Sequence, residues 1–419
     1  MAGGLMQLVA YGAQDVYLTG NPEVTFYQAK YKRHTNFAME NIEQTVNGTA
    51  ANSGRVSVTV ARNGDLVGDM YLELESAIAA TATAEAGDCN WVAERAISSV
   101  ELSIGGQRID KHYQKWWRLY SELYLDEAKK ATWGKMTTAA DTGTGTGAVY
   151  LPLIFFFNRN PGLYLPLIAL QYHEVRIDID LASDFDTFLN KSVLKVWANY
   201  VYLDTEERRR FAQKGHEYLI EQVQHTGTDT VDPSATKQVR LSYNHPVKEL
   251  VWCFSNTAAK SSLWNFTAKN LVTEVALESD HTAVNDSNCY VPISNLGTPM
   301  YATKLSSEAY TEENAGQLET FKLVLNGQDR FKEQKGKYFN QVQAYNHHSG
   351  CPAPGVYSYS FALKPEEHQP TGTCNFSRID NAQVAVKMAA GTATSMHMFA
   401  TNYNVLRIQS GMGGLAFSN

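Results

Sequence analysis

The sequence predicts an all-β fold of two tandem antiparallel sandwiches with a few short helices. Segments in which apolar and polar residues alternate are far more frequent than segments with helical spacing. One strand–turn–helix pattern occurs twice within the 419 residues, a length that favours two hydrophobic cores over one. Aromatic residues form 11% of the chain and include 23 tyrosines, which suits half-buried sheet surfaces.

The expected strands of both halves follow from this alternation. In "RVSVTV" the side chains of Val56, Val58 and Val60 share one face, and in "DMYLELE" Met70 and Leu74 do so. Further strands of the first half are expected at 99–104, 174–181 and 195–203. Those of the second half are expected at 238–243, 249–254, 321–327, 356–363, 382–388 and 402–408.

The repeated pattern joins a strand, a Gly-Gln turn and a basic-aromatic helix. It runs through residues 101–120 and again through 322–341. Gly106 recurs as Gly327 after 221 residues, and Lys115 recurs as Lys337 after 222, so one residue is inserted between these positions. Tyr338 and Phe339 of the second copy correspond to Trp116 and Trp117 of the first. We interpret the two halves as copies of one β domain.

Helices are expected at three places. Two of them, at 112–130 and 335–346, follow the two Gly-Gln turns. The third, at 204–213, begins with Asp204 or Thr205 as N-cap and has glutamates in its first turn, where the helix dipole favours them. This helix falls midway along the chain and is interpreted as the junction between the halves.

Long connections rich in Thr, Ala, Gly and Asp are expected to lie at the surface between strands. They occupy residues 80–88, 137–149, 225–237 and 295–317. Long insertions of this kind cost little closure entropy in a sandwich.

Composition excludes several classes of function. A net charge of -7 argues against a nucleic-acid-binding surface. Five widely spaced cysteines without a C-x-x-C pair indicate neither a disulfide scaffold nor a zinc ribbon, and favour a reducing compartment. The N-terminus lacks the basic start of a signal peptide, position 2 is Ala2, and no stretch has the ~20 apolar residues that cross a bilayer. We therefore expect a soluble protein.

Two acidic or metal-ligating motifs deserve an explicit interpretation. Asp178, Asp180, Asp184 and Asp186 in "RIDIDLASDFD" could serve acid-base or metal chemistry, but the first two alternate with apolar residues and are expected on the solvated face of a strand. The motif "NHHSGC" places His347, His348 and Cys351 close together in sequence. It is interpreted as a loop of no special role rather than a metal site.

Three further motifs carry no predicted chemistry. "DTGTGTGAV" lacks the Lys-Ser/Thr of a phosphate loop, and "EERRR" is interpreted as an interdomain salt-bridge network rather than a phosphate site. The sequons at Asn47, Asn190, Asn265, Asn285 and Asn375 are interpreted as chance matches. We predict no enzyme, no catalytic, cofactor-binding or metal-ligating residue, and no cofactor.

Several longer segments resemble one protein family in order along essentially the whole chain. They are "LVAYGAQDVYLTGNP", "TFYQAKYKRHTNFAMENIEQT", "RNGDL", "GGQRID", "YLDTEERRRFAQ" and "NYNVLRIQSGMGGLAFSN". Together they resemble the major capsid proteins of large icosahedral DNA viruses, nearest to those of algal viruses. The resemblance implies a double jelly roll, two eight-stranded sandwiches side by side. We accordingly expect an N-terminal arm at 1–24, a first jelly roll at 25–205, an interdomain helix or linker at 206–216 and a second jelly roll at 217–419.

The resemblance implies a structural function in a virion. Three chains would present six jelly rolls, so a homotrimer becomes a pseudo-hexagonal capsomer that tiles the facets of an icosahedral shell. Implied partners are neighbouring capsomers and minor capsid or cement proteins, with an inner membrane beneath the shell but no insertion and no direct contact with nucleic acid. Glycans on exposed Asn and assembly in the host cytoplasm are also implied, without named sites.

Alternatives remain for the function and for the arm. A lectin-like jelly roll would bind sugars through a compact aromatic and carboxylate site. An enzyme would need a convergent polar pocket, which the sequence does not indicate. The apolar side chains in residues 1–24 either lock a trimer or fold back onto the first domain.

Overall fold

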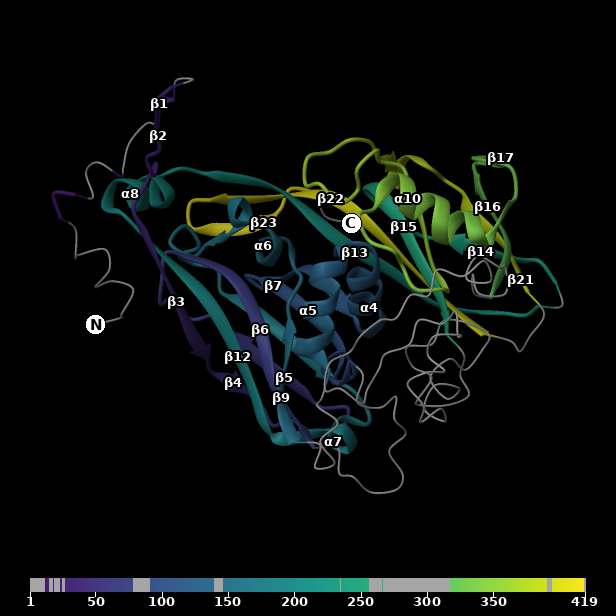
Figure 1. Ribbon diagram of the computed structural model, residues 1–419, viewed down its shortest axis with the longest axis horizontal. Coiled ribbons are helices and arrows are strands. Elements are labelled where there is room, and N and C mark those ends of the chain that lie inside the picture. The colour runs from purple at the N-terminus through teal and green to yellow at the C-terminus, as the bar shows by residue number, and fades with distance from the viewer. Residues whose placement is uncertain are drawn as a thin grey trace.

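The computed structural model contains two β sandwiches joined by one helix (Figure 1). It describes residues 27–77, 91–138, 146–233, 235–255, 317–389 and 394–417, and positions 12–14, 18, 23–24 and 266. A two-stranded ribbon near the N-terminus pairs β1 (Glu23–Val24) with β2 (Ala29–Lys30). Most of the predicted arm lies outside the described residues, as do the predicted loop at 80–88 and residues 295–316 of the loop predicted at 295–317.

Two five-stranded antiparallel sheets form the first sandwich. One has the order β10-β6-β12-β3 with β9 also paired to β6, and the other has the order β4-β5-β11-β7-β8. The strands are β3 (Phe37–Gln44), β4 (Val46–Asn47), β5 (Arg55–Thr59), β6 (Leu66–Ala77), β7 (Ile97–Ile104), β8 (Gln107–Tyr113), β9 (Thr146–Pro152), β10 (Leu165–Pro166), β11 (Val175–Leu181) and β12 (Leu189–Leu203).

The second sandwich has a six-stranded and a five-stranded sheet. Their orders are β13-β22-β15-β19, with β20 on β15 and β23 on β22, and β14-β21-β16-β17, with β18 on β16. The strands are β13 (His216–Val231), β14 (Lys237–Leu241), β15 (Pro246–Ser255), β16 (Leu318–Leu325), β17 (Gln328–Asp329), β18 (Gln334–Lys335), β19 (Val356–Ser360), β20 (Cys374–Asn375), β21 (Ala382–Met388), β22 (Thr394–Gln409) and β23 (Met412–Leu415).

Eight strands of each half correspond in pairing and in chain order. The sheet β9-β6-β12-β3 of the first half matches β19-β15-β22-β13 of the second. The sheet β5-β11-β7-β8 matches β14-β21-β16-β17. The additional strands are short or lie at sheet edges. This arrangement confirms the predicted double jelly roll of antiparallel sheets, and every strand segment expected from alternation is present.

Helices connect the strands and cover one side of the first jelly roll. They are α3 (Val92–Arg95), α4 (Gln114–Leu123), α5 (Glu127–Thr137), α6 (Phe156–Arg159), α7 (Phe185–Phe188), α8 (Thr205–Gln213) and α10 (Gln343–His347), with the short 3-10 helices η2 (Pro161–Leu163) and η9 (Phe376–Arg378). The segment η8 (Tyr338–Val342) is π-helical and leads directly into α10. The expected N-cap of the junction helix is confirmed, since the Asp204 side chain accepts a hydrogen bond from the backbone N–H of Thr205.

Three details of the expected elements are wrong. The loop expected at 137–149 ends earlier than expected, since β9 begins at Thr146. The helix expected at 112–130 is two helices, because the Asp126 carboxylate caps a new one by accepting from the backbone N–H of Lys129 at 2.7 Å. The loop expected at 225–237 is mostly strand, since β13 continues to Val231 against β22. Gly227, with φ of 116°, lies in the bulge that interrupts this pairing.

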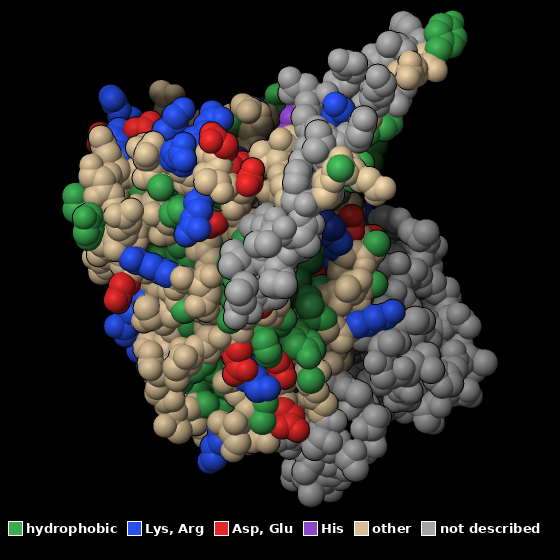
Figure 2. Space-filling model, turned by 90° about the vertical axis from the view of Figure 1, so that its left-hand side faces the viewer, with side chains coloured by type: hydrophobic (Ala, Val, Ile, Leu, Met, Phe, Trp, Pro, Cys, Tyr) green, Lys and Arg blue, Asp and Glu red, His purple; other side chains and the backbone are tan. Residues whose placement is uncertain are grey.

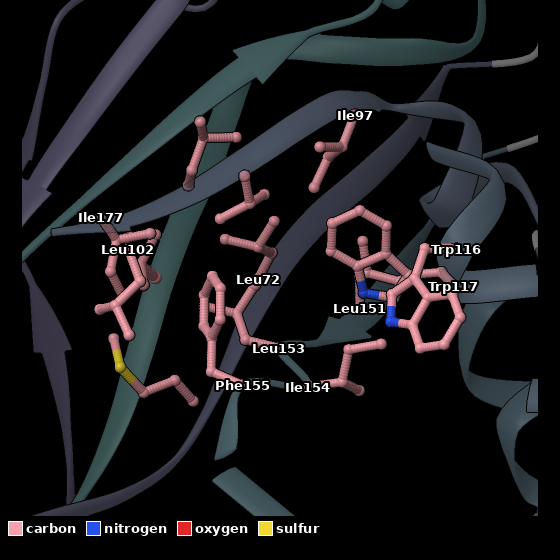
Figure 3. Packing of buried hydrophobic residues seen from close by; sticks show 14 of the residues in the cluster. Leu72, Ile97, Leu102, Trp116, Trp117, Leu151, Leu153, Ile154, Phe155 and Ile177 are labelled. Atoms are coloured by element: carbon pink, nitrogen blue, oxygen red, sulfur yellow. The ribbon is translucent and has the colours of Figure 1, made fainter. Parts of the chain in front are cut away.

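Each half has its own core, and the first core extends into the second half. The second core surrounds Trp252, whose ring stacks on Phe321 at 4.3 Å between centroids. In the first core, Trp116 and Trp117 reach from α4 toward Leu151 (Figure 3). The same cluster includes residues of the second jelly roll, namely Ile220, Val251, Cys253, Phe266, Val356, Phe399, Leu406 and Ile408. The two jelly rolls therefore share a continuous apolar interface.

Candidate functional site

An aromatic stripe on α4 forms the centre of the contact between the two jelly rolls. Trp116, Tyr120 and Tyr124 are spaced by four residues and contact one another in sequence along the helix. The Trp116 ring lies 5.6 Å from the ring of Phe399 on β22, and the Tyr124 hydroxyl donates to Glu249 on β15 at 2.5 Å. The outer face of the second jelly roll's larger sheet is thus covered by the first jelly roll.

The buried carboxylate of Glu221 on β13 forms ion pairs with two basic side chains at this contact. Arg159 from α6 approaches it at 3.0 Å and Lys248 from β15 at 2.7 Å, and His368 lies 3.5 Å away. Burial by itself would raise the pKa of Glu221, but Arg159 and Lys248 outweigh burial and lower it. The carboxylate is therefore charged and joins two elements of the second jelly roll to one of the first.

His348 occupies a second buried ionic centre. Its Nε2 lies 2.5 Å from Glu249 and its Nδ1 lies 3.3 Å from Glu366, and the ring contacts Tyr124 edge-on. Burial lowers the pKa of His348, but the two carboxylates outweigh burial and raise it to about 9. The interpretation of "NHHSGC" as a loop of no special role is wrong for His348, because folding brings Glu249 to it from 99 positions away.

The loop after His348 is fastened to the first jelly roll. The backbone N–H of Cys351 donates to Glu127 at 3.1 Å, and that of Ala353 donates to Glu122 at 3.1 Å. Lys130 pairs with Glu122 at 3.3 Å and also donates to the carbonyl oxygen of Cys351. A Cβ on Gly350 would lie 2.6 Å from a backbone oxygen of the first jelly roll, so this close approach requires glycine.

The aspartate pairs of "RIDIDLASDFD" form ion pairs instead of a shared site. Asp178 and Asp180 lie on β11 and both pair with Arg55, at 3.8 and 3.3 Å. Asp178 is only 9% exposed and also pairs with Arg176 at 2.8 Å, so the expectation of a solvated side chain is wrong for it. The flanking arginines replace water there.

The remaining two aspartates of this motif lie beyond the strand. Asp184 is 3.8 Å from Arg95, and Asp186 is 3.6 Å from Lys191. Asp184 and Asp186 therefore each have a cationic partner other than Arg55, which Asp178 and Asp180 share. Folding does not bring the four carboxylates to one site.

Two of the consecutive arginines on α8 form ion pairs with different parts of the chain. Arg208 pairs with Asp65 of the first jelly roll at 3.1 Å, and Arg209 pairs with Glu206 on the helix itself at 3.7 Å. The first pair agrees with the expected salt bridges between the junction and a jelly roll.

The structure describes only some residues of the remaining motifs. Residues 141–145 of the Gly-rich motif "DTGTGTGAV" and the sequons at Asn265 and Asn285 lie outside the described residues. Asn47 and Asn375 are exposed, and the Asn190 side chain donates to Glu75 at 3.0 Å.

Two hollows flank the contact between the jelly rolls. One of about 410 Å³ lies between β8 and β13 and is lined by Arg108, Asp110, Gln224 and His245, among others. A smaller one of about 250 Å³ contains the pair of Arg159 and Glu221 with Tyr120 and His368. In the described part of the chain, no three His, Cys, Asp or Glu residues are arranged to hold a metal ion.

The buried ion pairs make the contact between the two jelly rolls rigid. The buried acids and bases of the contact are paired with each other, and breaking such pairs is costly. The contact therefore fixes the relative position of the two jelly rolls.

Within the described ranges, no helix is long and apolar enough to span a membrane.

The ionic centres at Glu221 and His348 were not predicted from the sequence, although two charged residues of β15 indicate them. Lys248 and Glu249 interrupt the apolar strand "PVKELVWCFS", in which nearly every residue is buried. Charged residues in a fully buried strand need partners, but their identities depend on the fold.

Comparisons with known proteins agree along the chain. Residues 25–204 match the family model described as the major capsid protein N-terminus, and residues 207–414 match that of the large eukaryotic DNA virus major capsid protein. The major capsid protein of Paramecium bursaria Chlorella virus 1 is 44% identical, with all of both chains covered.

Solved structures agree as well. The structure titled as PBCV-1 VP54 fitted into a reconstruction of the virophage Sputnik has a TM-score of 0.78 at 40% identity, covering 94% of this chain and 100% of that one. The Faustovirus major capsid protein, at 12% identity, shares the fold with a TM-score of 0.67 over 92% and 93% of the two chains.

Proposed function

The chain belongs to the major capsid proteins of large eukaryotic DNA viruses, and on this premise we propose that three copies form a pseudo-hexagonal capsomer that tiles the facets of an icosahedral virion. Its function as a structural component of the virion capsid follows from family membership. The matches favour this function over the lectin-like alternative.

The observation that carries the proposed trimer is the strand-for-strand correspondence of the two jelly rolls. One chain contributes two similar bodies, so three chains around a threefold axis contribute six. Six similar bodies in a ring have an approximately hexagonal outline, and hexagonal units pave a flat facet. The paired charges at Glu221 and His348 support the proposal, because they keep the two bodies of one chain in a fixed orientation.

We further propose the division of the chain into an arm at 1–24, a first jelly roll at 25–205, a linker at 206–216 and a second jelly roll at 217–419. The helix α8 supports the position of the linker, because it lies between the last strand of one jelly roll and the first strand of the next.

The proposed surroundings of the capsomer follow from its place in a shell. Its partners are neighbouring capsomers and minor capsid or cement proteins, and assembly takes place in the host cytoplasm. The shell overlies an inner membrane without entering it, and the net charge of -7 supports the absence of nucleic-acid contact. Glycans are attached to exposed Asn residues.

We also propose that the chain has no enzymatic activity. The buried titratable groups at Glu221 and His348 are occupied by their ion pairs, whereas an active site needs groups directed toward a substrate.

The mass of the purified chain in solution, measured by light scattering, tests the trimer. We expect three times the 46.6 kDa of one chain. A stable monomer at all accessible concentrations would contradict the trimer, and binding of sugars by that monomer would support the lectin-like alternative instead.

A further inference from the structure

Two basic side chains of β8 face the larger hollow between the jelly rolls. Arg108 and Lys111 both line this hollow of about 410 Å³. Residues three apart on a regular strand point to opposite faces, but β8 has a bulge that leaves Ile109 out of register. Arg108 lies opposite Ser103 of β7, and Lys111 lies opposite Glu101. Because these two residues of β7 share a face, the bulge brings the two cations of β8 to one face as well.

Within the part of the chain that the structure describes, neither of these cations forms an ion pair. The Lys111 ammonium lies over the ring of Tyr113, 5.5 Å from its centre, instead of on Glu101. One carboxylate, that of Asp110, lines the hollow, but it is only 4% exposed. It accepts hydrogen bonds from the backbone N–H of Val223 at 3.0 Å and from that of Lys111 at 2.9 Å. The hollow therefore has an excess of positive charge.

Basic side chains in other parts of the molecule have acidic neighbours. Figure 2 shows the side of the molecule where α8 lies, and several Lys and Arg side chains on it are next to Asp or Glu. One pair on α8 joins Arg209 to Glu206. In the second jelly roll, the position equivalent to Arg108 is Asp329, which pairs with Lys322 at 3.1 Å. The repeated turn therefore does not require an unpaired cation at this position.

Neutral carboxamide and hydroxyl groups form much of the remaining lining, among them those of Gln107, Gln224, Ser242 and Asn244. The Gln224 side chain is fixed by the backbone of Asn244, because its Nε2 donates to the carbonyl oxygen at 2.6 Å and its Oε1 accepts from the N–H at 2.9 Å. Burial lowers the pKa of His225 and of His245. Both imidazoles are therefore neutral near pH 7, and the positive charge of the hollow comes from the two cations of β8.

We propose that this hollow binds an acidic saccharide, whose sulfate or carboxylate group lies on Arg108 and Lys111 while its hydroxyl groups bond to the neutral lining. Guanidinium and ammonium groups bind oxyanions through charge-assisted hydrogen bonds, and carboxamides both donate to hydroxyl groups and accept from them. The volume is within the range of about 300–1,000 Å³ that small-molecule sites have. An apolar ligand would leave the polar groups of the lining without partners. The site adds a binding function to a structural protein and does not depend on the number of chains in the capsomer.

Titration calorimetry of the full chain with a sulfated disaccharide tests the class of ligand. The unsulfated parent disaccharide and inorganic sulfate are the comparison probes. We expect the sulfated disaccharide to bind at least about tenfold more tightly than either, because it alone has both the charge and the hydroxyl groups. Equal affinity for inorganic sulfate overturns the inference, as does the absence of binding at millimolar concentrations. Tighter binding of an acidic peptide of the same charge also overturns it.

A double variant tests the location of the site. Arg108→Gln combined with Lys111→Gln is expected to weaken the binding of the sulfated disaccharide by at least about tenfold. The matched control combines Arg209→Gln with Arg210→Gln, which removes the same charge from α8 and is expected to leave the affinity unchanged. None of the four side chains is buried, so both variants are expected to keep the thermal midpoint of the wild type. Unchanged binding by the first variant, or equal weakening in both variants, overturns the inference.

Discussion

The two jelly rolls of this chain share a strand order but differ in what their helical side contacts. In the first, α4 is followed by α5, and its outward face is buried against the second jelly roll. In the second, η8 and α10 end at His347, and Tyr345 remains exposed. A duplicated domain thus acquires unequal surfaces simply because one copy precedes the other in a single chain.

Removal of equivalent core residues tests how far the two bodies unfold together. Trp117→Ala and Phe339→Ala each remove a completely buried ring, at an expected cost of about 3–5 kcal/mol in unfolding free energy. Because the first core includes residues of the second jelly roll, we expect both variants to shift one common denaturant transition. Two separate transitions, each sensitive to only one variant, would show instead that the bodies unfold independently.

Removal of the central carboxylate weakens the covered contact specifically. Glu221→Ala leaves Lys248 and Arg159 buried without their partner, and we expect a loss of about 3 kcal/mol in unfolding free energy. The control is Glu217→Ala on the same strand, where an exposed pair with Arg407 is expected to contribute less than about 1 kcal/mol. Equal losses in the two variants, measured by denaturant unfolding, would contradict the importance of the buried pair.

The covered contact is also expected to depend on pH through His348. Its pKa is about 9 in the folded chain, above the ordinary 6.5, so its stabilisation is complete below pH 6.5 and is lost as the pH rises through 9. The groups that face it are Glu249, Glu366 and Tyr124. We expect a loss of about 3 kcal/mol between pH 6.5 and pH 10.

Comparison with His348→Gln isolates this effect from other groups that titrate at high pH. Unfolding free energies measured at both pH values should fall less in the variant than in the wild type. Identical decreases in the two proteins would assign the pH dependence to other residues.

The smallest effect is expected at the junction between the bodies. Asp204→Ala removes the cap of α8 and is expected to cost about 1 kcal/mol, while Asp204→Asn keeps a capping oxygen and should stay near the wild type. Thermal unfolding of the three proteins distinguishes these outcomes. A much larger loss for Asp204→Ala would mean that the linker, rather than the covered contact, holds the two bodies in place.

The sequence by itself determined the strands, their duplication and the family. Alternation at Val56, Val58 and Val60 predicts a face because neighbouring residues of a strand point to opposite sides, which is a local property. The turns at Gly106 and Gly327 are also local features of the sequence, because both glycines adopt a positive φ that other residues rarely adopt.

Only the tertiary structure decided which charged groups meet and which helix face is covered. Glu249 and His348 are 99 positions apart, and Lys130 and the carbonyl group of Cys351 are 221 apart. No periodicity relates such residues, because their proximity arises from the packing of one jelly roll on another. For the same reason the burial of Leu123 on α4 and the exposure of Tyr345 on α10 follow from the position of each copy in the folded chain.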